Sequence, residues 1–363
     1  MRPVLILGGY GNFGKRIARA LVGMGIGVVI AGRNRAKALD LQADLGADVA
    51  ETAVFDVHTS LGQHLDIIKP CVVINTCGPF QLADYSVAQT CIAHGVHYID
   101  LADGRDFVTG IAGLDAAARA QAVAVISGAS TVPGLSSAVV VHFAHEFSQI
   151  DEMCYGIAPG QRAERGLATT RGILSYVGQR LRPFPGGACA YGWQDIHRQP
   201  YPGLGIRWMG NCDIPDLDLL PEKYGIANIR FSAGLELAPL HLGVWALGWL
   251  VRIGVPIHLP RWAAMLLKIS NLFDRFGTDD GGMHVILKGK GRDGRRHERH
   301  WFIIAKNGDG PQIPTIAAII LASDIALGRN VPNGARACVG MVDLPRYLDG
   351  LRGFAVETHE RVM

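Results

Sequence analysis

The seven cysteines of this chain include no Cys-x-x-Cys pair and no closely spaced, even-numbered set. This pattern excludes a disulfide scaffold and a zinc site of the usual spacing, and it is typical of reduced thiols. The first residues lead directly into an apolar run and then glycines, which is not the pattern of a signal peptide. We therefore expect a cytoplasmic location.

The sequence also has no large excess of positive or negative charge, since its net charge is +3 over 363 residues. We expect no nucleic acid partner, because nucleic-acid-binding surfaces are strongly basic. Charged residues and prolines interrupt the most apolar region, 240–269, so it offers no run of about 20 apolar residues for a membrane-spanning helix. Hydrophobic residues make up 49% of the chain and charged residues 18%, which is enough for a sizeable hydrophobic core. The length suggests two domains.

Short apolar runs alternate with helical segments over the first third of the chain. We expect strands at 3–7, 28–31, 53–55, 71–75, 97–99 and 123–127. This alternation predicts right-handed βαβ units and a parallel sheet, and the apolar character of the runs is typical of strands covered on both faces. The expected fold class is α/β, with an N-terminal Rossmann doubly wound sheet and a second α/β domain.

The second domain is expected to contain a mixed or antiparallel sheet, because 283–290 and 300–306 look like antiparallel strands joined by a glycine-punctuated stretch. A helix is expected at 314–327. We place the Rossmann NADP-binding domain at 1–130 and a substrate or dimerisation domain at 131–330. The C-terminal segment 331–363 is assigned separately, as a segment that could fold back onto the first domain.

Gly9, Gly11 and Gly14 form a Gly-x-Gly-x-x-Gly motif between an apolar strand and a segment with helical spacing. In this context the glycines permit a tight turn, close approach of the backbone to a pyrophosphate, and close packing of the helix. The helix N-terminus attracts the phosphates, and we expect Asn12 and Phe13 at the same site. A glycine-rich turn of an unrelated α/β domain is the alternative.

The second expected strand is followed by Arg33, Asn34 and Arg35, whereas NAD sites usually carry an acid there for the ribose 2′-OH. A guanidinium can hold a 2′-phosphate through charge-assisted bonds, so we assign these three residues to NADP binding. The alternative is that Arg33 and Arg35 only form the solvated start of a helix. Asp56, after the third strand, is suited either to accept from the adenine amino group or to cap a helix.

A resemblance to a known family rests on four segments, which occur in order across the first 150 residues: Gly8-Gly-Tyr-Gly-Asn-Phe-Gly14, Asn75-Thr-Cys-Gly-Pro-Phe80, His97-Tyr-Ile-Asp-Leu-Ala-Asp103 and Pro133-Gly-Leu135. These segments resemble the saccharopine dehydrogenase-like (saccharopine reductase/dehydrogenase NADP-binding domain) family. The resemblance implies NAD(P)-linked chemistry at a C–N or C=N bond, and a second domain that covers the site and often mediates dimerisation. It therefore implies a small-molecule substrate and a homodimer.

The fourth expected strand ends at Asn75, and ligands of open parallel sheets bind beyond the carboxyl ends of the strands. We therefore expect Asn75, Thr76, Cys77 and Gly78 beside the nicotinamide ribose. A tight Gly-Pro loop is the alternative, which does not exclude the contact. Cys77 could be taken for a nucleophile, but a small packed thiol is the commoner case.

The fifth expected strand delivers Tyr98, Asp100 and Asp103, which are the catalytic candidates. A carboxylate near an imine nitrogen can stabilise the cation and relay a proton, and Asp100 is the first choice. The alternative for each acid is a cap on the next helix.

Two further regions invite other interpretations. His284, His297 and His300 could suggest a metal site, but neighbouring arginines repel a cation, so we expect none. The apolar region 240–269 could form a buried helix pair, a dimer interface, or a surface for peripheral membrane contact through its tryptophans; a packed core is the preferred interpretation.

The leading hypothesis is an NADP(H)-dependent oxidoreductase of the saccharopine dehydrogenase type, acting on an unidentified substrate. The alternative is a non-catalytic NADP-binding sensor or a membrane-associated scaffold with the same fold. A short-chain dehydrogenase mechanism does not fit, because none of the nine tyrosines starts a Tyr-x-x-x-Lys motif.

Overall fold

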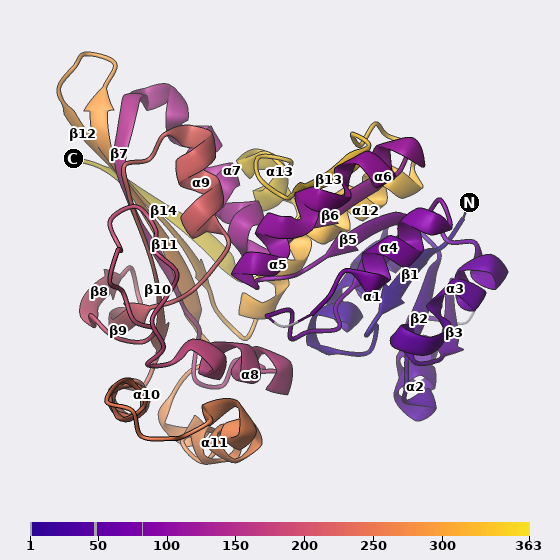
Figure 1. Ribbon diagram of the computed structural model, residues 1–363, viewed down its shortest axis with the longest axis horizontal. Helices are drawn as coiled ribbons and strands as arrows, with labels where there is room; N and C mark the ends of the chain where they lie inside the picture. The colour runs from indigo at the N-terminus through magenta and orange to yellow at the C-terminus, as the bar shows by residue number, and fades with distance from the viewer. Residues whose placement is uncertain (1, 47–48, 82) are drawn as a thin grey trace. The chain divides into compact units, whose positions relative to one another are not determined.

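The computed structural model describes residues 2–46, 49–81 and 83–363, which form two compact units (Figure 1). Unit 1 comprises Met1–Leu135 and Gln312–Gly350, and unit 2 comprises Ser136–Pro311 and Leu351–Met363. The chain therefore crosses between the units three times. Among the described residues, no helix has both the length and the apolar character needed to span a bilayer.

Unit 1 contains a sheet of seven strands in the order β3-β2-β1-β4-β5-β6-β13, and every neighbouring pair is parallel. The strands are β1 (Val4–Leu7), β2 (Val28–Gly32), β3 (Ala50–Val54), β4 (Val72–Asn75), β5 (His97–Asp100), β6 (Ala124–Ser127) and β13 (Gly334–Ala337). The strand order reverses between β1 and β4, which is the switch point of a doubly wound sheet. The expected Rossmann sheet is confirmed.

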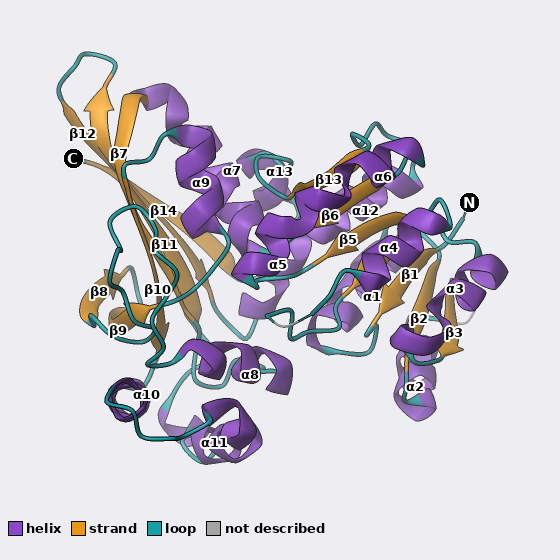
Figure 2. Ribbon diagram, in the orientation of Figure 1, coloured by secondary structure: helices purple, strands orange, loops and turns teal. Residues whose placement is uncertain are grey.

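Helices cover both faces of this sheet (Figure 2). They are α1 (Asn12–Gly23), α2 (Arg35–Leu45), α3 (Val57–Ile68), α4 (Ser86–Ala93), α5 (Arg105–Gly110), α6 (Asp115–Ala120), α12 (Ile316–Ala326) and α13 (Leu344–Asp349). Leu5 and Leu7 of β1 pack with α3, α4 and α6 in one core cluster. Ile6 is buried on the opposite face, since successive strand residues alternate between faces.

Helix α12 belongs to unit 1, although the sequence grouped residues 312–330 with the second domain. Its residues from Ile316 to Asp324 are all buried, and it packs against α1, β4 and β5. A helix that is apolar all round must be covered on every side. The following strand β13 then pairs with β6 and extends the parallel sheet.

Unit 2 contains a second seven-stranded sheet in the order β14-β12-β11-β7-β10-β9-β8. Its strands are β7 (Phe147–Ala158), β8 (His197–Tyr201), β9 (Gly205–Asn211), β10 (Asn228–Leu235), β11 (Gly281–Gly291), β12 (Arg296–Ala305) and β14 (Val356–Val362). Its helices are α7 (Ser136–Phe143), α8 (Leu167–Tyr176), α9 (Asp216–Tyr224), α10 (Ala238–Arg252) and α11 (Ala263–Asn271). Strands β7 and β10 are parallel and the other pairs antiparallel. This confirms the expected mixed sheet.

Candidate functional site

The turn after β1 brings backbone and helix into unusually close contact. Gly8 has φ +72°, a conformation that favours glycine, and its carbonyl accepts a hydrogen bond from Gly11 N at 2.8 Å. A Cβ added to Gly14 would lie 2.4 Å from Gly8 O and 2.7 Å from Gly9 Cα. Glycine at position 14 is therefore required for α1 to approach β1, as the motif predicts.

Helix α1 begins directly after this turn, with Gly11 at its N-cap and no capping side chain. Asn12 and the half-buried Phe13 occupy its first turn. The helix dipole therefore directs partial positive charge at the switch point between β1 and β4. This arrangement suits a phosphate group.

A cavity of about 320 Å³ opens at the carboxyl ends of β1, β2 and β4. Its size falls within the range of small-molecule sites. The wall includes Gly8, Tyr10, Gly32, Arg33, Phe55, Asp56, His58, Cys77 and Gly78. The cavity thus joins the glycine turn to the residues that follow β2, β3 and β4.

Arg33 is exposed and forms part of the cavity wall, and among the described residues it makes no ion pair. Strand β2 ends at Gly32, so no acid occupies the position that would bind a ribose 2′-OH. Asn34 caps α2 by accepting from Lys37 N at 3.1 Å. Arg35 is the first residue of that helix and is exposed.

Asp56 has the capping role considered from the sequence and also a place in the cavity wall. Its carboxylate caps α3 by accepting from His58 N at 2.9 Å, and the residue also lines the cavity. Sequence reasoning missed His58, Phe55 and Tyr10. The signal for Tyr10 was its place inside the glycine motif, and its hydroxyl accepts from Asn34 N at 2.8 Å.

The segment after β4 is held against the glycine turn. Asn75 is buried; its Oδ1 accepts from Cys77 N at 3.0 Å and its Nδ2 donates to Tyr98 Oη at 3.2 Å. Thr76 Oγ1 donates to Leu7 O at 2.8 Å. Cys77 and Gly78 therefore form a fixed edge of the cavity.

The thiol of Cys77 is not set up as a nucleophile. Desolvation raises its pKa to about 11, although the nearby Arg33 guanidinium acts in the opposite direction. The thiolate, which is the reactive form, is therefore scarce at neutral pH. Cys77 is nevertheless exposed at the cavity wall, so it is not the packed thiol expected from the sequence.

Asp100 has no exposed surface and ties the ends of β5 and β6 together. Its Oδ1 accepts from Ala102 N at 2.9 Å, Gly128 N at 2.8 Å and Ser127 Oγ at 2.9 Å. Burial raises its pKa to about 6 despite these bonds. It is not the cap of the next helix either, because the N-cap of α5 is Gly104.

Tyr98 and Asp103 differ in exposure. Tyr98 has no exposed surface, and burial raises its pKa further above the usual value. Asp103 is partly exposed, in the loop between β5 and α5. Its Oδ1 accepts from Gln81 Nε2 at 3.0 Å, and burial raises its pKa. None of the three candidates is among the residues that line the cavity.

The residues present fit a dinucleotide. The glycine turn is a cradle that a side chain would fill, the helix N-terminus points at it, and a cavity extends from it to an arginine. The groups that could hold a phosphorylated ribose are Arg33, Asn34 and Arg35, and Asp56 and His58 line the same cavity.

Residues 4–173 match the family model described as the Saccharopine dehydrogenase NADP binding domain. No curated protein matches the sequence. The structure is similar to apo saccharopine dehydrogenase (L-Glu forming) from Saccharomyces cerevisiae, with a TM-score of 0.65 and 12% identity over 99% of this chain and 100% of that chain. The match to 3-hydroxyacyl-CoA dehydrogenase type-2 from Mycobacterium avium has a TM-score of 0.29 and 20% identity over 34% of this chain and 71% of that chain. At 12% identity the similarity to saccharopine dehydrogenase shows the fold alone.

Proposed function

We propose that the protein is an NADP(H)-dependent oxidoreductase, because residues 4–173 match the family model described as the Saccharopine dehydrogenase NADP binding domain. Its substrate is a small molecule that is oxidised or reduced at a C–N or C=N bond. The observation that carries the cofactor assignment is Arg33, which lines the cavity without an ion-pair partner among the described residues, where an NAD site would place an acid.

A 2′-phosphate beside Arg33 would gain a charge-assisted bond, whereas a carboxylate at this position would repel it. Asn34 and Arg35 lie at the N-terminus of α2, where the helix dipole contributes partial positive charge and Arg35 contributes a second charged group. If these residues only form the solvated start of a helix, the protein should show no preference between NADPH and NADH.

NADP(H) supplies or accepts the hydride when it is bound. Asp103 is the chain's best candidate for moving the proton at the substrate nitrogen, because the residue is partly exposed and burial raises the pKa of its carboxyl. Asp100 and Tyr98 act as positioning residues, because they are buried and hold the ends of β5, β6 and β4 in place.

The cofactor assignment is tested by calorimetry with NADPH and NADH on the wild type and on Arg33→Asp. We expect Arg33→Asp to weaken NADPH binding roughly 10- to 100-fold, as for a lost charged hydrogen bond, and to leave NADH nearly unchanged. Lys37→Asp, an exposed residue of α2 outside the cavity wall, is the matched control. An equal loss for both cofactors would refute the 2′-phosphate argument.

The wild type and Asp103→Asn are assayed for oxidation of NADPH in the presence of imines formed from 2-oxo acids and amines. Asp103→Asn is expected to keep the affinity for NADPH and to lower kcat roughly 100-fold, since a positioned acid contributes about 10²–10⁴. A wild-type protein that binds NADPH and turns over none of these compounds would favour the sensor alternative.

A further inference from the structure

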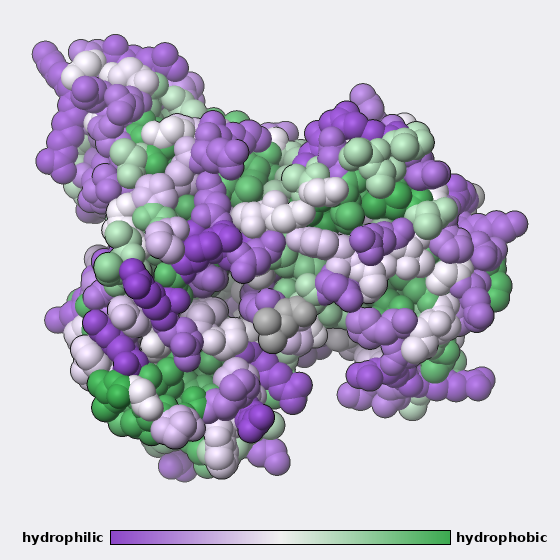
Figure 3. Space-filling model, in the orientation of Figure 1, coloured by the Kyte–Doolittle hydropathy of each residue, from purple (hydrophilic) through white to green (hydrophobic). Residues whose placement is uncertain are grey.

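Helices α10 and α11, which cover the apolar region of the sequence, are not buried within their unit. The exposed residues of α10 recur at helical spacing, at Leu242, Ala246, Trp249, Leu250 and, just beyond the helix end, Ile253. Figure 3 shows apolar side chains gathered over α10 at the lower left of the view. This stripe is what an amphipathic helix presents to an apolar partner.

Helix α11 exposes a second stripe of the same kind. Ala264, Met265, Lys268, Ile269 and Leu272 are exposed and fall on one helix face. Leu272 is 73% exposed and Ile253, at the end of α10, is 69% exposed. Large apolar residues at such exposure, repeated over two neighbouring helices, indicate an interaction surface.

The charges of this surface have one sign. Residues 237–273 contain Arg252, Arg261 and Lys268 and no Asp or Glu, and all three basic residues are exposed. The next acid along the chain, Asp274, is paired with Arg165 at 3.0 Å. Apolar stripes flanked by cations alone are complementary to an anionic lipid surface.

A cavity of about 390 Å³ lies between α8, α10 and α11. Its wall is almost entirely apolar and includes Ile173, Leu240, Val244, Leu247 and Leu266. This volume is within the range of small-molecule sites. Its apolar lining suits a single apolar chain.

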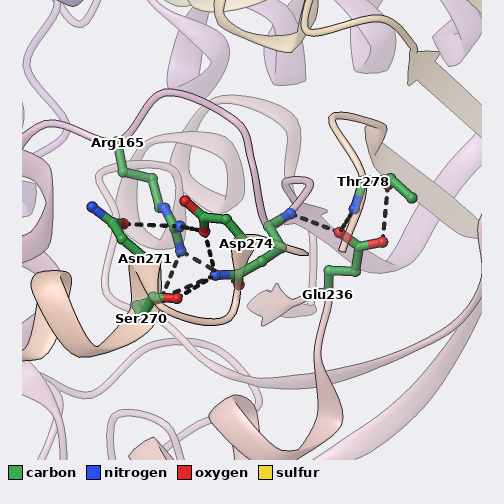
Figure 4. A network of polar contacts seen from close by, with 7 residues as sticks. Arg165, Glu236, Ser270, Asn271, Asp274 and Thr278 are labelled. Carbon is green, nitrogen blue, oxygen red and sulfur yellow. Dashed lines mark hydrogen bonds and ion pairs between the residues drawn. The ribbon is translucent and has the colours of Figure 1, made fainter. Parts of the chain in front are cut away.

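One end of this cavity is polar and held by a network of hydrogen bonds (Figure 4). Arg165 donates to Ser270 Oγ at 2.8 Å and to Asp274 Oδ1 at 3.0 Å. Gln161 Nε2 donates to Ser270 O at 2.8 Å. These contacts join the segment before α8 to the end of α11, so the cavity has a fixed wall.

We propose that the exposed stripes of α10 and α11 dock the protein on an anionic membrane surface, and that a lipid acyl chain enters the cavity between these helices. The aromatic residues Trp249 and Trp262 suit the boundary between headgroups and chains. A second copy of this chain is the competing occupant. A two-fold interface through this surface would join two cationic surfaces, with no carboxylate in 237–273 to pair with their basic residues.

The docking is tested by sedimentation of the full chain with vesicles of phosphatidylcholine and phosphatidylserine. Ile253→Glu is expected to weaken binding roughly 10-fold or more, the effect of losing one buried aliphatic side chain. Ile67→Glu is the matched control, because Ile67 lies on α3 of unit 1 and is 77% exposed. Circular dichroism and thermal unfolding, measured in parallel, show that each variant is folded.

The electrostatic part is tested with Arg261→Gln and with vesicles of phosphatidylcholine alone. Arg261→Gln should weaken binding to the anionic vesicles about fivefold, and high salt should weaken it further. Equal binding to both vesicle types, or unchanged binding of Ile253→Glu, would overturn the proposal. Self-association that Ile253→Glu abolishes, with no vesicle binding, would assign the surface to a second copy instead.

The cavity is tested with a fluorescent long-chain fatty acid as the probe. A Cβ added to Gly243, which lines the cavity, meets no atom within 4 Å, so Gly243→Phe is expected to fold and to fill the space. It should abolish saturable binding of the probe. Gly23→Phe on α1, where the added Cβ also meets nothing within 4 Å, should bind it normally. Binding that survives Gly243→Phe unchanged would remove the cavity from the proposal.

Discussion

At the residue scale, the position of Asp100 in the chain suggested its possible roles, whereas its position in the fold determines its burial, its hydrogen bonds and its pKa. Its place at a strand end suggested either catalysis or a helix cap, because both need a carboxylate there. The structure surrounds it with three donors, of which Ser127 Oγ and Gly128 N come from residues 27 and 28 positions later in the chain. Burial still outweighs these bonds and raises the pKa to about 6.

This pKa predicts a change of stability with pH. The folded-state pKa of about 6 lies above the unfolded value of about 3.9, so the folded state binds the proton more tightly between these values. Asp100 therefore favours the unfolded state above pH 6, and this cost is relieved as the pH falls toward 4. The free energy of unfolding of the wild type relative to Asp100→Asn should rise by up to about 3 kcal/mol from pH 7 to pH 4, in urea titrations.

Asp100→Ala provides the control for the hydrogen bonds. It removes the acceptor of Ala102 N, Gly128 N and Ser127 Oγ and should be about 2–4 kcal/mol less stable than Asp100→Asn at both pH values, since neither variant titrates at this position. If the wild type and Asp100→Asn differ by the same free energy at pH 7 and pH 4, the raised pKa is wrong.

At the scale of elements, the contact between α1 and β1 depends on one glycine, while another glycine of the same helix is unconstrained. An added Cβ at Gly14 would meet backbone atoms of Gly8 and Gly9 below 3 Å, whereas one at Gly23 meets nothing within 4 Å. Backbone neighbours cannot rotate away as a side chain can. The helix would therefore have to move away from the strand.

Gly14→Ala and Gly23→Ala thus form a matched pair of substitutions. We expect Gly14→Ala to destabilise the protein by about 1–3 kcal/mol through overpacking and to weaken NADPH binding. Gly23→Ala should leave binding unchanged and stabilise by up to about 1 kcal/mol, the propensity difference within a helix. Thermal unfolding and calorimetry measure both quantities, and equal effects of the two substitutions would contradict the packing argument.

Among the elements that the sequence patterns missed, one has no pattern of its own. Strand β13 consists of Gly-Ala-Arg-Ala and is a strand because β6 offers it an open edge. Helix α12 was expected, but a helix buried on all sides has no polar face to indicate which sheet it packs against.

At the scale of the whole molecule, unit 1 is assembled from two distant segments, Met1–Leu135 and Gln312–Gly350. The second segment supplies α12, which packs on β4, β5 and α1, and the strand β13. Without it, one apolar face of the sheet and the edge of β6 would be exposed to water.

This arrangement predicts the behaviour of fragments. Residues 1–135 alone should aggregate, whereas a chain that joins 1–135 to 312–350 through a flexible Gly/Ser linker should fold and bind NADPH. A linker can connect them because the segment Thr131–Leu135 packs against α12. Size-exclusion chromatography and calorimetry test both chains. A monomeric 1–135 fragment that binds NADPH as tightly as the full protein would show that the second segment is dispensable.

The sequence by itself determined the Rossmann sheet, the glycine turn and the arginine after β2, because each depends on residues close together in the chain. Strand and helix periods, a motif of six residues and the first residue beyond a strand are all local features. Only the tertiary structure decided that Asp100 is a buried tie between strands, that α12 completes the first unit, and that α10 and α11 expose their apolar stripes. Burial depends on which distant segments pack against a side chain, and no local pattern specifies those partners.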